Sequence, residues 1–102
     1  MTEPPLLLPE AQKDVADAFL WYEHQKMGLG MEFLRCVETA LLAIQRTPLT
    51  YPIAIESYRR LLVRHFPFAI FFEFETALNR YVVYSVFHCS QDPEKWKTRL
   101  PT

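Results

Sequence analysis

The side chains in this sequence that are best suited to chemistry are cationic, and their longest stretch is Arg59, Arg60, Arg64 and His65. Three further cations follow near the end of the chain: Lys95, Lys97 and Arg99. In a β-strand, Arg60 and Arg64 would share one face and Arg59 would point to the other. Such guanidinium groups could bind phosphate or an acidic peptide, or they could keep an edge strand from pairing with another chain. The pattern gives these two interpretations equal weight.

His88 is the residue most open to an interpretation as a general acid or base, because it follows an apolar segment and adjoins a loop. Acid–base catalysis needs a second group within hydrogen-bond reach, and the spacing places no carboxylate or nucleophile there. A structural hydrogen bond is therefore the favoured role. The three histidines, His24, His65 and His88, lack ligand spacing, and two glycines cannot build a phosphate-binding loop. We expect neither a metal nor another cofactor.

The composition is that of a small, aromatic-rich chain without an electrostatic field for nucleic acid. Its 102 residues suit a single domain spanning residues 1–102. The formal net charge is -1 and the pI is about 6.3, so we do not expect direct nucleic-acid binding. Cys36 and Cys89 show no ligand pairing, and the leucines at 6–8 are too few for a signal peptide or a membrane span. We therefore expect a cytoplasmic protein that does not contact the membrane.

Helical periodicity dominates the first half of the chain. Apolar residues at helical spacing start after Pro9, a residue that suits a first helical turn. Gly28 should end this helix, and a second apolar stripe runs from Gly30 to Thr47, which precedes a proline. Since only a tight turn joins them, the two helices should form an antiparallel hairpin. The three leucines before Pro9 could form a short strand.

Two-residue periodicity replaces the helical pattern after Pro52. Strands are expected at Tyr58–His65, Phe68–Glu75 and Arg80–His88. The expected fold class is α+β, with a short N-terminal strand and an α-helical hairpin packed on an antiparallel β-meander. The buried core should include Phe33, Val37, Leu41, Ile70, Phe72 and Val83.

Two tryptophans lie outside this core pattern. Trp21 lies off the apolar stripe of the first helix, which hints at a surface for a partner. Trp96 follows Asp92 and Pro93, a pair that favours a turn, so it could fold back against the sheet as a structural clip.

Several segments, taken in order, carry a resemblance over roughly Pro9 to Arg99. They are Ala18-Phe19-Leu20-Trp21-Tyr22-Glu23, Gly28-Leu29-Gly30 with Phe33-Leu34, Arg59-Arg60 before Phe66-Pro67-Phe68-Ala69-Ile70-Phe71-Phe72, and Val86-Phe87-His88-Cys89-Ser90-Gln91-Asp92-Pro93 with Trp96 and Arg99. Only the series as a whole is specific. Together the segments resemble the small toxins of bacterial type II toxin–antitoxin modules, of the RelE/ParE superfamily.

This resemblance implies a toxin that is held inactive by a cognate antitoxin, which wraps it with a helix and an extended segment. RelE-like members cleave messenger RNA on the ribosome with basic residues, whereas ParE-like members, the plasmid stabilisation toxins, inhibit DNA gyrase without that set. Ala69 and Gln91 stand where similar toxins commonly carry arginine. Losing one such donor typically costs about 2–4 kcal/mol of transition-state stabilisation. The chain is therefore more similar to the ParE-like branch.

We accordingly expect a gyrase inhibitor without enzymatic activity, which binds its antitoxin through Trp21, Arg59, Arg60, Arg64, Lys95 and Arg99. Two alternatives stay open. One is a RelE-like mRNA endonuclease, in which Arg60, Arg64 and His88 would carry the phosphate chemistry. The other is a toxin-derived binding module that has lost its toxicity.

Overall fold

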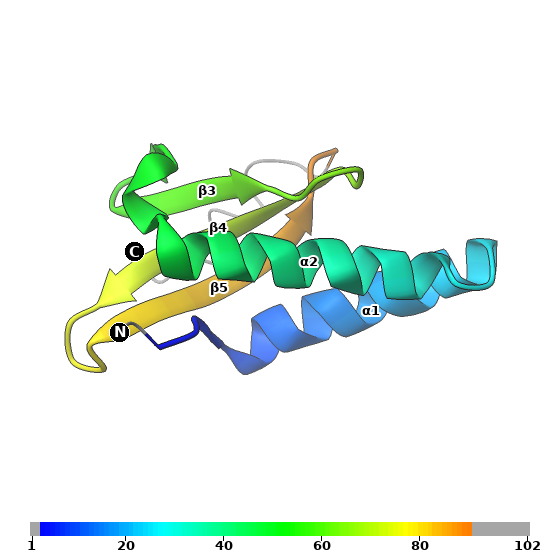
Figure 1. Cartoon of the computed structure of the whole chain (residues 1–102), viewed down its shortest axis with the longest axis horizontal. Coiled ribbons are helices and arrows are strands. Elements are labelled where there is room, and N and C mark those ends of the chain that lie inside the picture. Colours follow the sequence, from blue (N-terminus) through cyan, green and yellow to red (C-terminus); the bar gives the residue numbers. More distant parts are fainter. Residues whose placement is uncertain (1–2, 91–102) are drawn as a thin grey trace.

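The computed structural model describes residues 3–90, in which two long helices precede the main strands of a sheet (Figure 1). The elements in chain order are β1 (Leu6–Leu7), α1 (Pro9–Gln25), α2 (Leu29–Arg46), the short 3-10 helix η1 (Pro48–Thr50), β2 (Ile53–Ile55), β3 (Tyr58–Leu62), β4 (Phe68–Glu75) and β5 (Arg80–His88).

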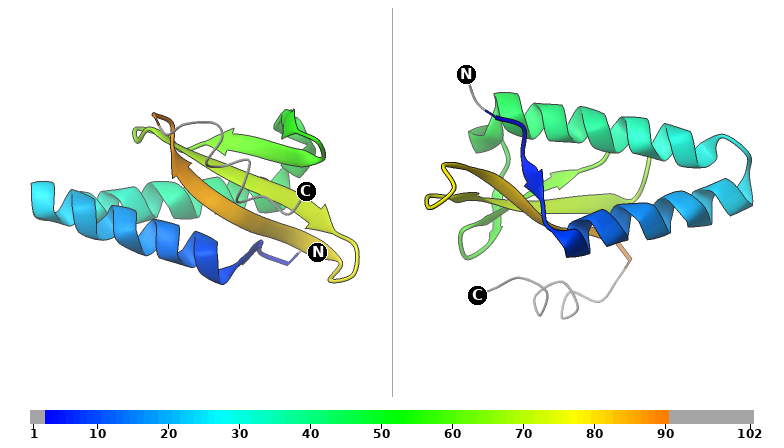
Figure 2. Two further views of the ribbon diagram at one scale, coloured as in Figure 1. Left: turned by 180° about the vertical axis from the view of Figure 1, so that it is seen from behind. Right: turned by 90° about the horizontal axis from the view of Figure 1, so that it is seen from below.

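The five strands form one sheet in the order β1-β5-β4-β3-β2. Neighbours from β2 to β5 are antiparallel, as expected for a meander, while β1 lies parallel to β5 and makes the sheet mixed. Both helices pack on one face of the sheet, as two further views show (Figure 2). The expected α+β class is confirmed, with a short first strand, a helical hairpin and a meander.

The helical hairpin closes more tightly than the sequence indicates. α1 ends at Gln25 rather than at Gly28, and α2 begins at Leu29. Gly28 has a φ of 90°, a left-handed conformation that suits glycine, and it leads directly into α2. The carboxylate of Glu23 accepts hydrogen bonds from the backbone N–H groups of Gly28 at 3.0 Å and Gly30 at 2.9 Å. One acidic side chain of α1 thus satisfies two backbone donors at the start of α2.

Gly30 is buried where α2 packs against Phe19 and Glu23 of α1. A Cβ atom built on Gly30 would lie 2.8 Å from both the ring and the carbonyl oxygen of Phe19. Only glycine therefore allows this approach of α2 to α1.

The strand predicted at Tyr58–His65 is shorter than expected, because β3 ends at Leu62. His65 has a φ of 67°, so the chain turns there and cannot continue as a strand. Arg64 therefore lies in the turn and not on the face that it would share with Arg60. The sequence also misses β2, whose three residues are too few to show an alternation. The ranges predicted for β4 and β5 are confirmed.

The main core lies between the helical hairpin and the sheet. It includes Phe33, Val37, Ile70, Phe72 and Val83 as predicted, whereas Leu41 is only partly buried against it. A second cluster lies on the other side of the sheet and consists of Tyr58, Ala69, Phe71 and Phe87. The register of β4 and β5 shifts by one residue between the pairs Phe71–Ser85 and Phe72–Val83, which is a β-bulge. The bulge is the reason that Val83 and Val86 both face the helices.

Candidate functional site: the groove between α1 and the end of β5

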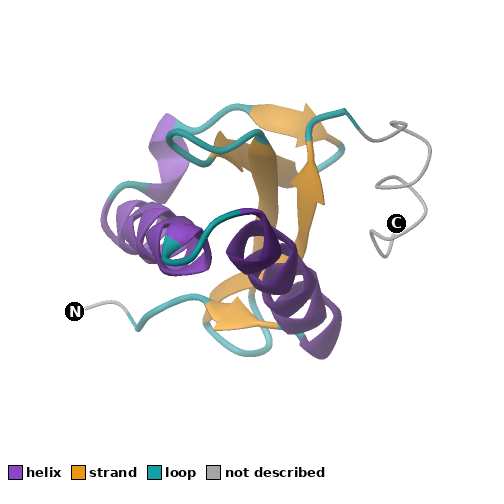
Figure 3. Cartoon of the chain, turned by 90° about the vertical axis from the view of Figure 1, so that its right-hand side faces the viewer, coloured by secondary structure: helices purple, strands orange, loops and turns teal. Residues whose placement is uncertain are grey.

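Two adjoining hollows separate α1 from the end of β5. The larger has a volume of about 450 Å³, and its lining includes Asp14, Asp17 and Ser90. The smaller has a volume of about 230 Å³, and its lining includes Trp21. Ala18, Phe68 and His88 line both, so the hollows form one groove. Figure 3 views the molecule from the side, with the sheet next to the two helices.

Trp21 is 58% exposed beside this groove, as the sequence pattern predicts for a residue off the apolar stripe. Its ring packs edge-on against Tyr22, with the ring centroids 5.1 Å apart. Tyr22 in turn contacts Phe33 and Phe66 in the core. The exposed indole is therefore held by a rigid aromatic cluster, which lowers the entropy that it would lose on binding a partner.

His88 lies on the wall of the groove and is held by its neighbours. The Nδ1 atom accepts a hydrogen bond from the backbone N–H of Ser90 at 3.0 Å, and the Ser90 hydroxyl lies 2.7 Å from the same atom. The imidazole ring also packs edge-on against Phe68, at 5.1 Å between centroids. Because Nδ1 accepts from a backbone donor, the neutral ring carries its proton on Nε2.

The acidic wall of the groove comes from α1. The Asp14 carboxylate accepts a hydrogen bond from the Val86 backbone N–H at 3.0 Å, which joins α1 to β5. Asp17 forms an exposed ion pair with Lys13 at 2.7 Å, a type of pair that contributes little to stability. Sequence analysis missed both carboxylates. Their spacing from Trp21, seven and four residues along one helix, was the signal that placed them on the same side of α1.

The predicted arginines point in different directions. Arg59 faces the helices, and its Nη1 donates to the Tyr51 carbonyl at 2.6 Å, so it holds the segment before β2. Arg60 pairs with Phe71 on the face of the sheet that points away from the helices. Arg64 is exposed in the turn after β3. Two further predicted residues, Lys95 and Arg99, lie outside the described residues.

The three residues of the nuclease interpretation are therefore not gathered on one surface. His88 lines the groove on the helical side, while Arg60 is on the opposite face of the sheet. Arg64 is near the end of β5, because Cys89 donates its backbone N–H to Pro67 in the same turn, at 2.6 Å. Ala69, which stands where similar toxins commonly carry arginine, is buried on the outer face of the sheet and supplies no positive charge there.

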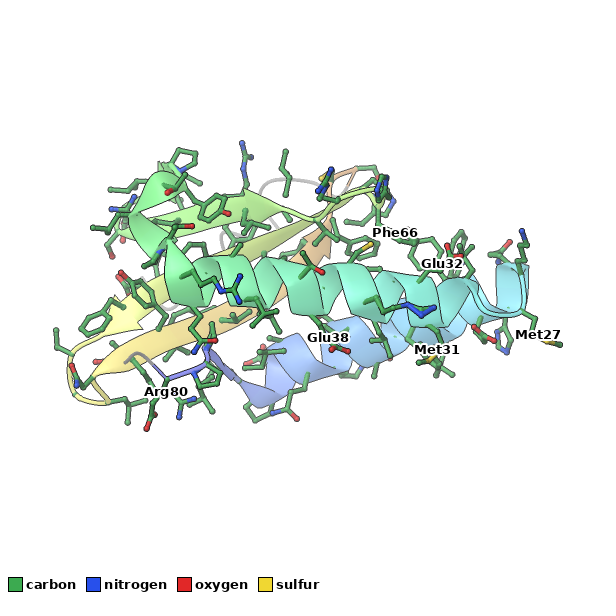
Figure 4. All side chains as sticks on the ribbon, in the orientation of Figure 1. Met27, Met31, Glu32, Glu38, Phe66 and Arg80 are labelled. Atoms are coloured by element: carbon green, nitrogen blue, oxygen red, sulfur yellow. The ribbon has the colours of Figure 1, made fainter. Side chains whose placement is uncertain are left out.

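A third hollow, of about 400 Å³, lies on the other flank of the hairpin. It is bounded by α2 and by the turn that joins β3 to β4, through Leu29, Glu32, Arg35, Cys36, His65 and Phe66. Figure 4 shows Phe66 beside α2, on the same side as Glu32, with Met27 at the tip of the hairpin. The hairpin thus has a hollow along each flank.

The described residues contain no group of three or more His, Cys, Asp or Glu side chains that could hold a metal ion. Within residues 3–90, neither helix has the length and apolar character needed to cross a membrane.

The sequence matches no protein-family model and no curated protein. The structure, however, is similar to a solved chain described as "Chromosomal ParDE TA system from P. aeruginosa", with a TM-score of 0.74. The match covers 85% of this chain and 96% of that chain, at 11% sequence identity. Such low identity carries information about the backbone alone. By its element order, its sheet and this match, the chain has the α+β fold of that chain from the ParDE system.

Proposed function

We propose that this chain is the toxin of a bacterial type II toxin–antitoxin system, that it inhibits DNA gyrase, and that a cognate antitoxin neutralises it. The observation that carries the proposal is the backbone match to a chain of a ParDE system over 85% of the sequence, at a TM-score of 0.74. The resemblance of the sequence segments along the chain supports it independently.

The antitoxin would bind where the hairpin meets the end of the sheet. Trp21 supplies an exposed aromatic anchor, and tryptophan and arginine are the side chains most often found at the energetic centre of an interface. Arg64 supplies an exposed cation in the nearby turn. An acidic amphipathic segment that folds on binding would satisfy both features. Arg59, Arg60, Lys95 and Arg99 complete the proposed set, although Arg59 already donates to Tyr51.

The choice of gyrase over messenger RNA rests on the arrangement of cations. RNA cleavage needs several donors around one phosphate, where charge develops in the transition state. Arg60 and His88 are on opposite faces of the sheet, and Ala69 is buried without a charge. This arrangement favours a target that is recognised by a protein surface.

A pair of assays on the purified chain tests the proposal. The first measures supercoiling of relaxed plasmid by gyrase, and the second maps cleavage of messenger RNA by primer extension in a translating extract. We expect loss of supercoiling and an unchanged RNA. A Lys26→Ala variant, altered at an exposed residue after α1, is the control and should inhibit gyrase as the parent does.

If the RNA is cut in phase with codons, and the cuts disappear in Arg64→Ala or His88→Ala, the proposal of a gyrase inhibitor is wrong and the chain is an mRNA endonuclease. If natively folded protein is active in neither assay, the result supports the third interpretation, a toxin-derived binding module that has lost its toxicity.

A further inference from the structure

A hollow with apolar walls lies at the end of the molecule opposite the tip of the helical hairpin, where η1, β2 and the end of β4 meet (Figure 1). Its volume is about 260 Å³, and its lining includes Leu49, Ile53, Phe74 and Tyr81. Leu49 is 71% exposed and Ile53 is 56% exposed. Large apolar side chains that are exposed together around a hollow favour contact with another molecule.

The same hollow contains one cation and one anion that do not pair with each other. Arg59 and Glu73 both line it, and neither forms an ion pair within the described part of the chain. The Nη1 atom of Arg59 donates to the Tyr51 carbonyl, but a guanidinium group has five N–H donors, so others remain for a carboxylate. Glu73 accepts from the Ser57 hydroxyl through Oε2, which leaves Oε1 for another donor.

The surroundings of Glu73 favour a cation supplied from outside the chain. Burial raises the pKa of its carboxyl group, and the negative charges of Glu75 and Glu56 raise it further. Each of these influences disfavours the charged carboxylate. A guanidinium group placed against Glu73 would stabilise that charged form with a strong hydrogen bond.

We propose that this hollow is the interface of a homodimer, in which a second copy of the chain packs the same surface against it. In a contact with two-fold symmetry, every pair of residues occurs twice, so Arg59 of each copy can pair with Glu73 of the other. Leu49 of each copy then enters the hollow of the other and is removed from water. The contact is formed by side chains, and it needs no pairing of the three-residue strand β2.

The charges in the hollow favour a second copy over other occupants. An acidic peptide or a nucleic acid would place like charges against Glu73, Glu75 and Glu56, whereas a basic partner would place them against Arg59. A second copy brings one cation for each anion of the Arg59–Glu73 pair. The formal net charge of -1 per chain also adds little repulsion between copies. The inference does not depend on the proposed function, because it concerns two copies of one chain.

Sedimentation velocity of the purified full-length chain tests the interface. We expect a reversible equilibrium in which the mass rises with concentration from 12.1 kDa toward twice that value. The mass should stop at the dimer, because a two-fold contact closes on itself. A mass that stays at the monomer value up to about 1 mM, or that grows beyond the dimer, would overturn the proposal.

A pair of leucine variants locates the contact on the surface. Leu49→Lys should raise the Kd of the dimer at least about tenfold, because it places a charge in the apolar part of the interface. Leu42→Lys is the matched control, since Leu42 is an exposed leucine of α2 that does not line the hollow. Dimerisation of Leu49→Lys as strong as that of the parent would contradict the proposal, and so would equal weakening by both variants.

An exchange of charges identifies the pairing itself. Glu73→Arg places two cations in the hollow and Arg59→Glu places two anions, so each variant alone should be monomeric. An equimolar mixture should form a heterodimer, because every cation then faces an anion. Circular dichroism checks that each variant is folded, which matters for Arg59→Glu because it removes the hydrogen bond to Tyr51. A mixture of folded variants that remains monomeric would overturn the proposal.

Discussion

Trp21 is an exposed aromatic side chain beside the groove, and we propose that it anchors the antitoxin. Truncating such an anchor at the centre of an interface typically costs at least about 2 kcal/mol, or roughly thirtyfold in Kd. We therefore expect Trp21→Ala to weaken antitoxin binding by at least this factor in titration calorimetry. Leu20→Ala is the matched control, because Leu20 is 55% exposed on the same helix but does not line the groove. Equal losses in both variants would place the interface elsewhere.

Glu73 gives the stability of the chain a specific dependence on pH. Burial raises its pKa above the ordinary value of 4.5, and Glu75 and Glu56 add to the effect. The folded chain then binds this proton more tightly than the unfolded chain does. The resulting stability is greatest at low pH and is lost as the pH rises from the ordinary value through the raised one.

Glu73→Gln removes this titration. The variant should be more stable than the parent at neutral pH, and the difference in Tm should shrink as the pH falls toward about 4. Thermal unfolding over this pH range measures it, with Glu38→Gln on the exposed side of α2 as the control. A difference that stays constant with pH, or that grows at low pH, would show that Glu73 is not the titrating group.

The site illustrates which residue-level features a sequence reveals. The exposure of Trp21 follows from its position on the helix, and the opposite directions of Arg59 and Arg60 follow from strand alternation. The groove does not follow from either, because its walls come from α1 and from the end of β5, which are far apart in the chain. The bulge between β4 and β5 also changes which face each residue of β5 occupies, and no local pattern signals it.

Gly30 sets the distance between the two helices of the hairpin. Helix propensity alone predicts that Gly30→Ala stabilises the chain by up to about 1 kcal/mol. The added Cβ, however, would lie 2.8 Å from the Phe19 carbonyl oxygen, and a backbone atom cannot move aside cheaply. We expect the clash to prevail, with a loss of about 1–3 kcal/mol in the free energy of unfolding. Denaturant unfolding checks this, and a gain in stability would mean that the helices separate readily.

β4 carries aromatic side chains at two depths on the face toward the helices. Phe72 is fully buried, so Phe72→Ala should destabilise the chain by about 3–5 kcal/mol. Phe74 lies two residues further along the same face and is 41% exposed, so the same substitution there should cost much less. Urea unfolding of the two variants measures the contrast. Similar losses would show that the side chains near the turn between β4 and β5 are packed as tightly as those in the middle of the two strands.

The elements themselves were largely predictable, and the exceptions have physical reasons. Long segments with clear periods, such as α2, β4 and β5, were placed almost to the residue. β2 was missed because three residues show no period. The end of β3 was predicted too late in the chain. Val63 has an apolar side chain and donates its backbone N–H to the Phe68 carbonyl, so it resembles a strand residue, but the chain turns at His65.

At the scale of the whole molecule, the helical hairpin covers one face of the sheet and overhangs its end. The overhang creates a hollow along each flank, and the sheet edge itself is short, since β2 has three residues and β1 two. Short edge strands discourage pairing with other chains. Partners are therefore expected at the flanks of the hairpin.

The central claim, that this chain is a toxin controlled by an antitoxin, is tested most directly by bacterial growth. The chain is induced alone, together with a candidate antitoxin taken from a reading frame that adjoins its gene, and together with a scrambled version of that candidate. We predict that growth stops with the chain alone and with the scrambled candidate, and that the intact candidate antitoxin restores it. Undiminished growth with the chain alone, at confirmed expression of folded protein, would contradict the account.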